Sequence, residues 1–169
     1  MAFESLLIAT QVTTSPLIPR EALFQQPSCM AVKLSPNGQR MASISANKDG
    51  AMNVCVSDDL TLPTKQLTHF HDPKIKMFYW SSDSTKIFFL KDTDGKDRHH
   101  LYWLDTQSGK LKNLTEKYGT INAKFFAVSH HTNKAVIGIT TSSPQFYDLF
   151  LLNTDDSTLT ELLKNDRYI

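Results

Sequence analysis

The chain has 169 residues, of which 40% are hydrophobic and 10% aromatic, enough for one domain with a sizeable core. Its 18 basic and 17 acidic side chains are scattered and leave a net charge of +1, so the charge pattern indicates neither a nucleic acid nor a membrane surface as partner. Residues 1–11 carry no basic residue and only a short apolar run, which argues against a secretion signal or a membrane span. We therefore expect a soluble, cytoplasmic protein.

Short runs of apolar, β-branched and aromatic residues, bounded by turn-forming residues, predict strands along the whole chain. In chain order these strands are expected at 30–34, 40–46, 51–57 and 64–68, then at 75–80, 86–91, 100–105 and 111–115, and finally at 123–128, 134–140, 147–152 and 159–163. Runs such as KIFFL at 86–90 are apolar on consecutive positions, which is typical of strands buried on both faces. Ser35-Pro36-Asn37-Gly38 predicts a tight turn between the first two strands.

The predicted strands follow a repeat of 46 to 48 residues. The same pattern starts at Leu34, Trp80 and Val128: an apolar residue is followed by a polar turn, a basic residue and a strand. Two further anchors keep the same period, at Asn53, His100 and Asp148 and at Gln66, Asn113 and Glu161. A repeat of this length with four short strands indicates β-propeller blades, because each blade is sandwiched between its neighbours.

The fold class is therefore expected to be all-β, with about three four-stranded antiparallel blades of an incomplete, open β-propeller. Residues 1–28 are expected to form an N-terminal extension and a lead-in segment. Residues 29–169 form the partial propeller, with blades at about 29–74, 75–122 and 123–169.

Several motifs resemble those of the prolyl oligopeptidase family of serine peptidases, closest to its acylaminoacyl-peptidase and dipeptidyl-peptidase branch. The matching positions are Pro19-Arg20, Leu23-Phe24, Pro27, Ser35 to Gly38, Met41-Ala42, Asn53-Val54, Trp80, Phe88 to Asp97, Leu101-Tyr102, Lys110 to Thr115 and Asn165-Asp166. Asn37 stands where the family usually has aspartate, and Cys55 where tryptophan is common. The resemblance covers most of residues 17–166 and implies a WD40-like or TolB-like propeller.

In that family an N-terminal propeller of seven or eight blades caps a C-terminal α/β-hydrolase domain. The resemblance implies that the propeller excludes large folded substrates and contributes to peptide binding. This chain ends after about three blades, so we expect it to be a non-catalytic part of such an enzyme.

No catalytic residue is predicted. The nucleophile elbow of an α/β-hydrolase needs the pattern G-x-S-x-G, and none of the six glycines has a serine two positions later. No cofactor is predicted, and no metal either. The histidine pairs 69 and 71, 99 and 100, and 130 and 131 lack further ligands at a suitable spacing. Asp92-Thr93-Asp94-Gly95 lacks the later residues of a calcium loop, so an Asx-type turn is the better interpretation.

The side chains that should be mostly buried are Val32, Leu34, Ala42, Ile44, Val54, Val56, Trp80, Ile87, Phe89, Leu101, Trp103, Phe126, Val128, Val136, Ile139, Leu149 and Leu151. Cys29 and Cys55 are expected to be buried free thiols. Phe78, Tyr79, Trp80, Phe125 and Phe126 are interpreted as core residues, although they could also line a binding groove. The end blades should leave apolar faces uncovered, at residues 54–56 and 149–152.

Two functions therefore compete. The first is the partial propeller of a peptidase, whose partners would be the missing blades or a hydrolase domain in trans, peptides, or a second copy. The second is a stand-alone scaffold that binds a protein partner through exposed blade surfaces. An independent enzyme has almost no support in the sequence.

Overall fold

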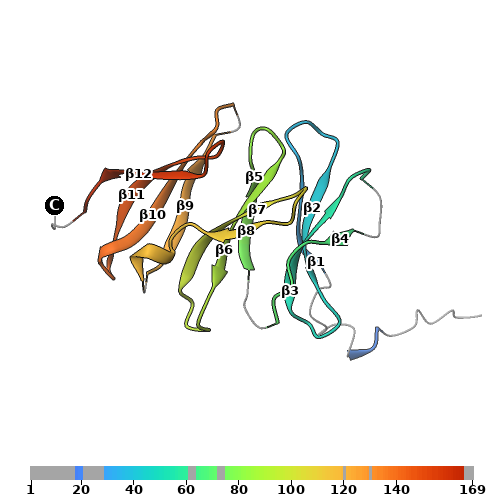
Figure 1. Cartoon of the computed structure of the whole chain (residues 1–169). Coiled ribbons are helices and arrows are strands. Elements are labelled where there is room, and N and C mark those ends of the chain that lie inside the picture. Colours follow the sequence, from blue (N-terminus) through green and yellow to red (C-terminus); the bar gives the residue numbers. More distant parts are fainter. Residues whose placement is uncertain are drawn as a thin grey trace, which may run out of the picture.

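The computed structural model describes residues 18–20, 29–60, 64–71, 75–119, 121–129 and 131–165. Within them the chain forms twelve strands in three four-stranded antiparallel sheets, and each sheet is built from four consecutive strands (Figure 1). One short 3-10 turn, η1 (Glu116–Tyr118), follows the second sheet. The all-β expectation of three antiparallel blades is confirmed.

The first sheet contains β1 (Cys29–Leu34), β2 (Met41–Ala46), β3 (Met52–Ser57) and β4 (Lys65–Gln66). The second contains β5 (Ile75–Trp80), β6 (Lys86–Asp92), β7 (His99–Asp105) and β8 (Leu111–Asn113). The third contains β9 (Ala123–Val128), β10 (Lys134–Ser143), β11 (Phe146–Asn153) and β12 (Thr158–Leu163). The predicted strands all exist, although the fourth strand of the first sheet is shorter than expected and β10 is longer.

The three sheets lie side by side with the second in the middle, so its two faces each meet another sheet (Figure 1). Strand β6 supplies both contacts because its side chains alternate between the faces. Ile87 and Phe89 join the apolar cluster with the first sheet, whereas Phe88 and Leu90 join the cluster with the third. This arrangement explains why residues 86–90 are apolar without alternation.

Most of the predicted core is buried. Ala42, Ile44, Val54, Val56, Trp80, Ile87, Phe89, Leu101 and Ile139 are all buried, as expected. Trp103, Val128, Val136, Leu149 and Leu151 are half-buried. The prediction was wrong for Val32, Leu34 and Phe126, which are 55%, 60% and 50% exposed. These three side chains lie in the end sheets, whose far faces meet no other sheet among the described residues.

The expectation for the uncovered faces needs a correction. Val54 and Val56 pack towards the second sheet, and Cys55 between them is also buried, so residues 54–56 are not an exposed apolar face. In the third sheet, Phe150 and Leu152 are core residues, while the alternate positions Leu149 and Leu151 are only half-buried. Cys29 is exposed, contrary to expectation, and Cys55 is the buried free thiol.

Basic residues at the start of the second strand of a sheet connect that sheet to the next one. Arg40 Nη1 donates to Thr106 Oγ1 at 2.6 Å, and the same guanidinium pairs with Asp58 at 2.7 Å. Lys86 Nζ donates to the backbone oxygen of Asp155 at 2.8 Å. Both donors reach the turn between the third and fourth strands of the following sheet.

A buried polar residue occupies the start of the third strand in every sheet. Asn53 Oδ1 accepts from Thr68 Oγ1 at 2.9 Å and Phe70 N at 2.7 Å. His100 Nδ1 lies 3.0 Å from Thr115 Oγ1, and Asp148 Oδ1 accepts from Asn165 N at 2.6 Å. Each of these contacts ties the third strand to the chain that leaves the fourth, so the repeated position has a structural role.

Ionisable groups at this position make folding sensitive to acid. Burial lowers the pKa of His100 below its ordinary value of 6.5. Burial of Asp148 acts to raise its pKa, but hydrogen bonds from Thr141, Asn165 and Ser142 outweigh it and hold the pKa below 3.8. Each group therefore binds its proton less readily in the folded state than in the unfolded state.

No helix in the described part of the chain is long and apolar enough to cross a membrane.

The first prediction compares two neighbouring phenylalanines on opposite sides of β9. Phe125 is buried with its ring centroid 4.8 Å from that of Tyr79, whereas Phe126 is half exposed. Phe125→Ala should lower the free energy of unfolding by about 3 kcal/mol, because it opens a cavity between two sheets. Phe126→Ala should cost less than about 1 kcal/mol. Urea denaturation measures both, and equal losses would contradict the assignment of the two faces.

The second prediction concerns His100. Because its pKa is lower in the folded state, the stability that it supports is present above pH 6.5 and declines as the pH falls below that value. His100→Asn installs the residue that the first sheet uses at this position, so the melting temperature should depend less on pH between about 7 and 5. The exposed His131→Asn variant is the control and should melt with the wild-type pH profile. An unchanged slope in His100→Asn would contradict the prediction.

Candidate functional site

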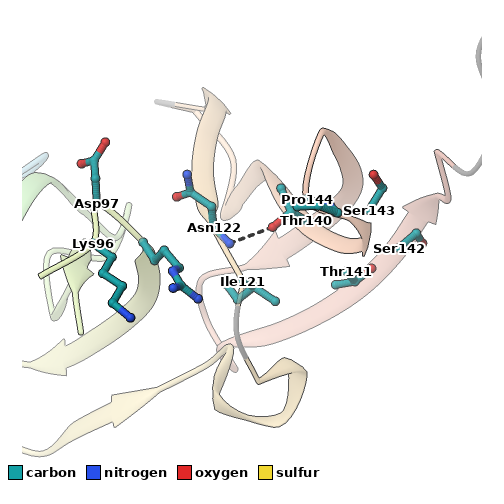
Figure 2. A pocket seen from close by; sticks show the side chains of 10 residues that line it. Lys96, Asp97, Ile121, Asn122, Thr140, Thr141, Ser142, Ser143 and Pro144 are labelled. Carbon is teal, nitrogen blue, oxygen red and sulfur yellow. Dashed lines mark hydrogen bonds between the residues drawn. The ribbon is translucent and has the colours of Figure 1, made fainter. Parts of the chain in front are cut away.

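A polar cleft of about 590 Å³ opens between the second and third sheets, where three connections meet (Figure 2). Its lining residues are Lys96, Asp97, Arg98, Ile121, Asn122, Thr140, Thr141, Ser142, Ser143 and Pro144. They come from the β6–β7 loop, the β8–β9 connection and the β10–β11 hairpin. The sequence predicted no site residue, so reasoning from the sequence missed this cleft.

The β6–β7 loop is held by the carboxylate of Asp92. Asp92 Oδ1 accepts from the backbone N–H groups of Asp94 at 3.1 Å and Gly95 at 3.0 Å, and Oδ2 accepts from that of Asp97 at 3.1 Å. Burial acts to raise the pKa of Asp92, but these bonds outweigh it and hold the pKa below 3.8. The loop is thus the Asx-type turn expected from the sequence, and it fixes the cleft wall that carries Lys96.

Asn122 joins the two sheets at the cleft. Its backbone N–H donates to Thr140 Oγ1 at 2.8 Å, the bond drawn as a dashed line in Figure 2, and its backbone oxygen accepts from Thr140 N at 3.1 Å. Asn122 Oδ1 accepts from the backbone N–H of His99 at 3.2 Å. Hydrogen bonds therefore connect the three segments that form the walls of the cleft.

Charges of both signs lie along the cleft. Arg98 Nε is 3.5 Å from Asp94 Oδ2, and His99 Nε2 is 3.5 Å from Asp97 Oδ1. Lys96 and Asp97 lie on one side of the cleft, and Ser142, Ser143 and Pro144 lie on the other (Figure 2). Cations, carboxylates and hydroxyls on facing walls suit a ligand that both donates and accepts hydrogen bonds.

The residues considered for metal binding do not come together. His99 and His100 are buried and bonded to neighbouring side chains, while His69 and His71 are exposed. His130 lies outside the described residues. Across the described part of the chain, no group of three or more histidine, cysteine or carboxylate side chains could hold a metal ion.

The aromatic residues divide between core and surface. Phe78, Trp80 and Phe125 are buried in the two clusters, as expected. Tyr79 is half-buried, and the Lys33 ammonium lies 3.6 Å from its ring centroid. None of these aromatic residues lines the cleft, so the cleft is formed by polar loop residues.

No protein-family model matches the chain. The sequence is 28% identical to dipeptidyl aminopeptidase BIII of Pseudoxanthomonas mexicana over 163 residues, which are 95% of this chain and 23% of that protein. It is 22% identical to dipeptidyl peptidase family member 6 of Caenorhabditis elegans over 170 residues, or 97% of this chain and 23% of the relative. The chain therefore spans about a quarter of the length of these relatives.

Solved structures share the fold at low sequence identity. A putative TolB from Agrobacterium tumefaciens matches with a TM-score of 0.56 and 17% identity, over 81% of this chain and 47% of that one. The β-propeller domain of the Trilobed protease from Pyrococcus furiosus matches with a TM-score of 0.56 and 18% identity, over 81% and 43%. Acylaminoacyl peptidase from Pyrococcus horikoshii matches with a TM-score of 0.53 and 15% identity, over 81% and 25%.

These structures show the fold, and the two dipeptidyl peptidases show which proteins the sequence is similar to. Similarity to them runs through nearly all of the chain, across all three sheets. The chain is therefore similar, over nearly all of its length, to about a quarter of two dipeptidyl peptidases, and it folds as three blades of a β-propeller.

Proposed function

We propose that this chain is a non-catalytic part of the β-propeller of a prolyl-oligopeptidase-type serine peptidase. In this proposal the propeller caps the active site and controls which peptides enter. The observation that carries the proposal is the similarity to dipeptidyl peptidases over 95% of the chain, in a region that folds entirely as blades. The sequence contains no G-x-S-x-G elbow, so the proposed role is in access and binding and not in bond cleavage.

The polar cleft is the place where the blades would contact a peptide. It lies at one end of the blades, where loops from two sheets meet, and loops on a rigid scaffold commonly carry binding residues. The cations Lys96 and Arg98 suit a peptide carboxylate or carbonyl groups, and Ser143 adds a hydroxyl. Hydrogen bonds through Asp92 and Asn122 hold the backbone segments that carry these groups before a ligand arrives.

A second function, a scaffold for a protein partner, is favoured by one observation. Phe126, Leu162 and Leu163 are exposed apolar side chains in the third sheet. Apolar side chains gathered on one surface often mark contacts between proteins. In this alternative the chain holds its partner through a sheet face and the polar cleft has no ligand.

The third prediction tests the absence of catalysis. The purified chain should not cleave dipeptidyl, acylaminoacyl or prolyl chromogenic substrates, and a fluorophosphonate probe should label none of its serines, because no serine lies in a nucleophile elbow. Intact-mass spectrometry after probe treatment reads out the result, with an active serine peptidase as positive control. One probe adduct per chain would refute the non-catalytic role.

The fourth prediction tests the cleft as a peptide site. A fluorescein-labelled hexapeptide with a free C-terminus should bind the chain, and the double variant Lys96→Glu with Arg98→Glu should bind it about tenfold more weakly because both cations are reversed. Fluorescence anisotropy measures the dissociation constants. Lys110→Glu, an exposed position away from the cleft, is the matched control and should bind like wild type.

Equal binding by the double variant would exclude the cleft as the site. If wild type binds no peptide at all, the scaffold function gains support, and the peptidase relationship is left untouched because it rests on the sequence match.

A further inference from the structure

A second pocket, of about 410 Å³, lies where the edge strands of all three sheets come together. Lys33 and Leu34 line it from β1, Tyr79 and Trp80 from β5, and Val128 from β9. The turn that follows each of these strands completes the lining, and we name this site the edge-strand pocket. The polar cleft lies by the β6–β7 loop, at the other end of β6 from the β5–β6 turn, so the two sites are separate.

The wall of the edge-strand pocket is largely apolar, and its tryptophan is held in place. Trp80 Nε1 donates to the backbone oxygen of Lys33 at 3.1 Å, which fixes the indole ring beside β1. Leu34 is 60% exposed and Val128 is half-buried, although both are apolar strand residues, and both line the pocket. An apolar group that enters the pocket would therefore bury these side chains further, which is favourable in water.

The Lys33 ammonium supplies a positive charge to the pocket. It lies 3.6 Å from the ring centroid of Tyr79, and its side chain forms no hydrogen bond or ion pair with the described residues. Burial lowers the pKa of Lys33 below its ordinary value of 10.5, because a buried ammonium loses part of its hydration. An aromatic ring replaces that hydration less well than a carboxylate does. The ammonium is thus placed to receive an anion.

The repeat shows what the serine at the end of the first strand normally does. Ser35 and Ser81 open the turn between the first and second strands of their sheets. The hydroxyl of Ser35 donates to Asn37 Oδ1 at 2.7 Å, and that of Ser81 donates to Asp83 Oδ1 at 2.5 Å. In both sheets the side chain two residues later therefore takes up the hydroxyl proton of the serine.

Ser129 opens the equivalent turn of the third sheet and also lines the pocket, but its turn lacks this acceptor. His131 stands two residues later and has no carboxyl or amide oxygen in its side chain. Ser129 Oγ accepts from the backbone N–H groups of His131 at 3.2 Å and Thr132 at 2.9 Å, and it donates to no group among the described residues. Its proton is available to a ligand in the pocket.

We propose that the edge-strand pocket binds a small organic carboxylate with an apolar body. The carboxylate accepts from the Lys33 ammonium and the Ser129 hydroxyl, and the apolar body lies against Leu34, Val128 and the indole of Trp80. No carboxylate of the described residues lines the pocket, so none there repels the anion. The volume lies within the usual range of about 300 to 1,000 Å³ for small-molecule sites. This inference is independent of the proposed peptidase role, because it depends only on this pocket.

The fifth prediction uses Trp80 as its reporter. The chain has two tryptophans, so Trp103→Phe leaves Trp80 as the only one. Titration of this variant with N-acetylphenylalanine should change the fluorescence of Trp80. The acid should bind at least about tenfold more tightly than the uncharged N-acetylphenylalanine amide, because only the acid accepts a charge-assisted hydrogen bond. Isothermal titration calorimetry of the wild-type chain measures both affinities without the reporter.

Two variants remove the donors one at a time. Lys33→Met keeps an apolar stem over Tyr79 but removes the charge, so the acid should bind no more tightly than the amide. His131→Asn supplies the acceptor that Asn37 provides in the first sheet, so it should occupy the Ser129 hydroxyl and weaken binding of the acid about threefold. Both variants should bind the amide like wild type, which shows that the pocket is still folded.

Control variants test where the acid binds. Lys110→Met removes an exposed charge away from the pocket and should leave both affinities unchanged. The double variant Lys96→Glu with Arg98→Glu should also bind the acid like wild type, and a loss there would place the carboxylate in the polar cleft instead. The proposal is overturned by that loss, by equal binding of acid and amide, by no binding in either measurement, or by a preference for the acid that survives Lys33→Met.

Discussion

Face-to-face packing of sheets that are apolar on both sides is the constraint on which this structure depends. The middle sheet places Phe89 against one neighbour and Phe88 against the other, and both rings are almost fully buried. A four-stranded sheet of this kind cannot be stable alone, because either face in water would expose several large apolar side chains. The 46- to 48-residue repeat follows from this need, since every unit must present the same two faces to equivalent neighbours.

Polar groups set how the sheets meet, while the apolar clusters supply most of the stability. Trp80 Nε1 donates to the backbone oxygen of Lys33 at 3.1 Å, which links the first strands of two sheets. Thr106 Oγ1 accepts a hydrogen bond from Arg40, but the equivalent hydroxyl of Thr154 is buried and has no hydrogen-bond partner among the described residues. The difference arises because Lys86 Nζ donates to the backbone oxygens of Thr154 and Asp155, in the turn between β11 and β12, and not to the hydroxyl of Thr154. The basic residue at this repeated position therefore donates to a side-chain hydroxyl in one sheet contact and to backbone oxygens in the other.

The repeat allowed the strands and their pairing to be predicted, because the same strand pattern occurs three times and each copy supports the others. The direction of individual side chains was less predictable. In β9, Ala127 pairs with Val136 and Phe125 with Ile137, so Phe126 is an extra residue that resets the alternation. The sequence analysis placed both Phe125 and Phe126 in the core, although only Phe125 is buried. A bulge of this kind leaves no mark in the local sequence.

The cleft could not be predicted because its walls come from loops some forty residues apart, whose meeting depends on how two sheets pack. Only the Asp92 turn had a local signature, since an aspartate followed by turn-forming residues predicts an Asx turn. The contribution of Asn122 required knowing that the β8–β9 connection passes between a loop of one sheet and the hairpin of the next.

The cleft and the sheet-to-sheet contacts are mechanically linked. Lys96 belongs to the second sheet and Ser143 to the third, so the distance across the cleft changes with the angle between the sheets. Two sets of hydrogen bonds between the sheets fix that angle. Asn122 bonds to Thr140 at one end, and Lys86 donates to the backbone oxygen of Asp155 at the other.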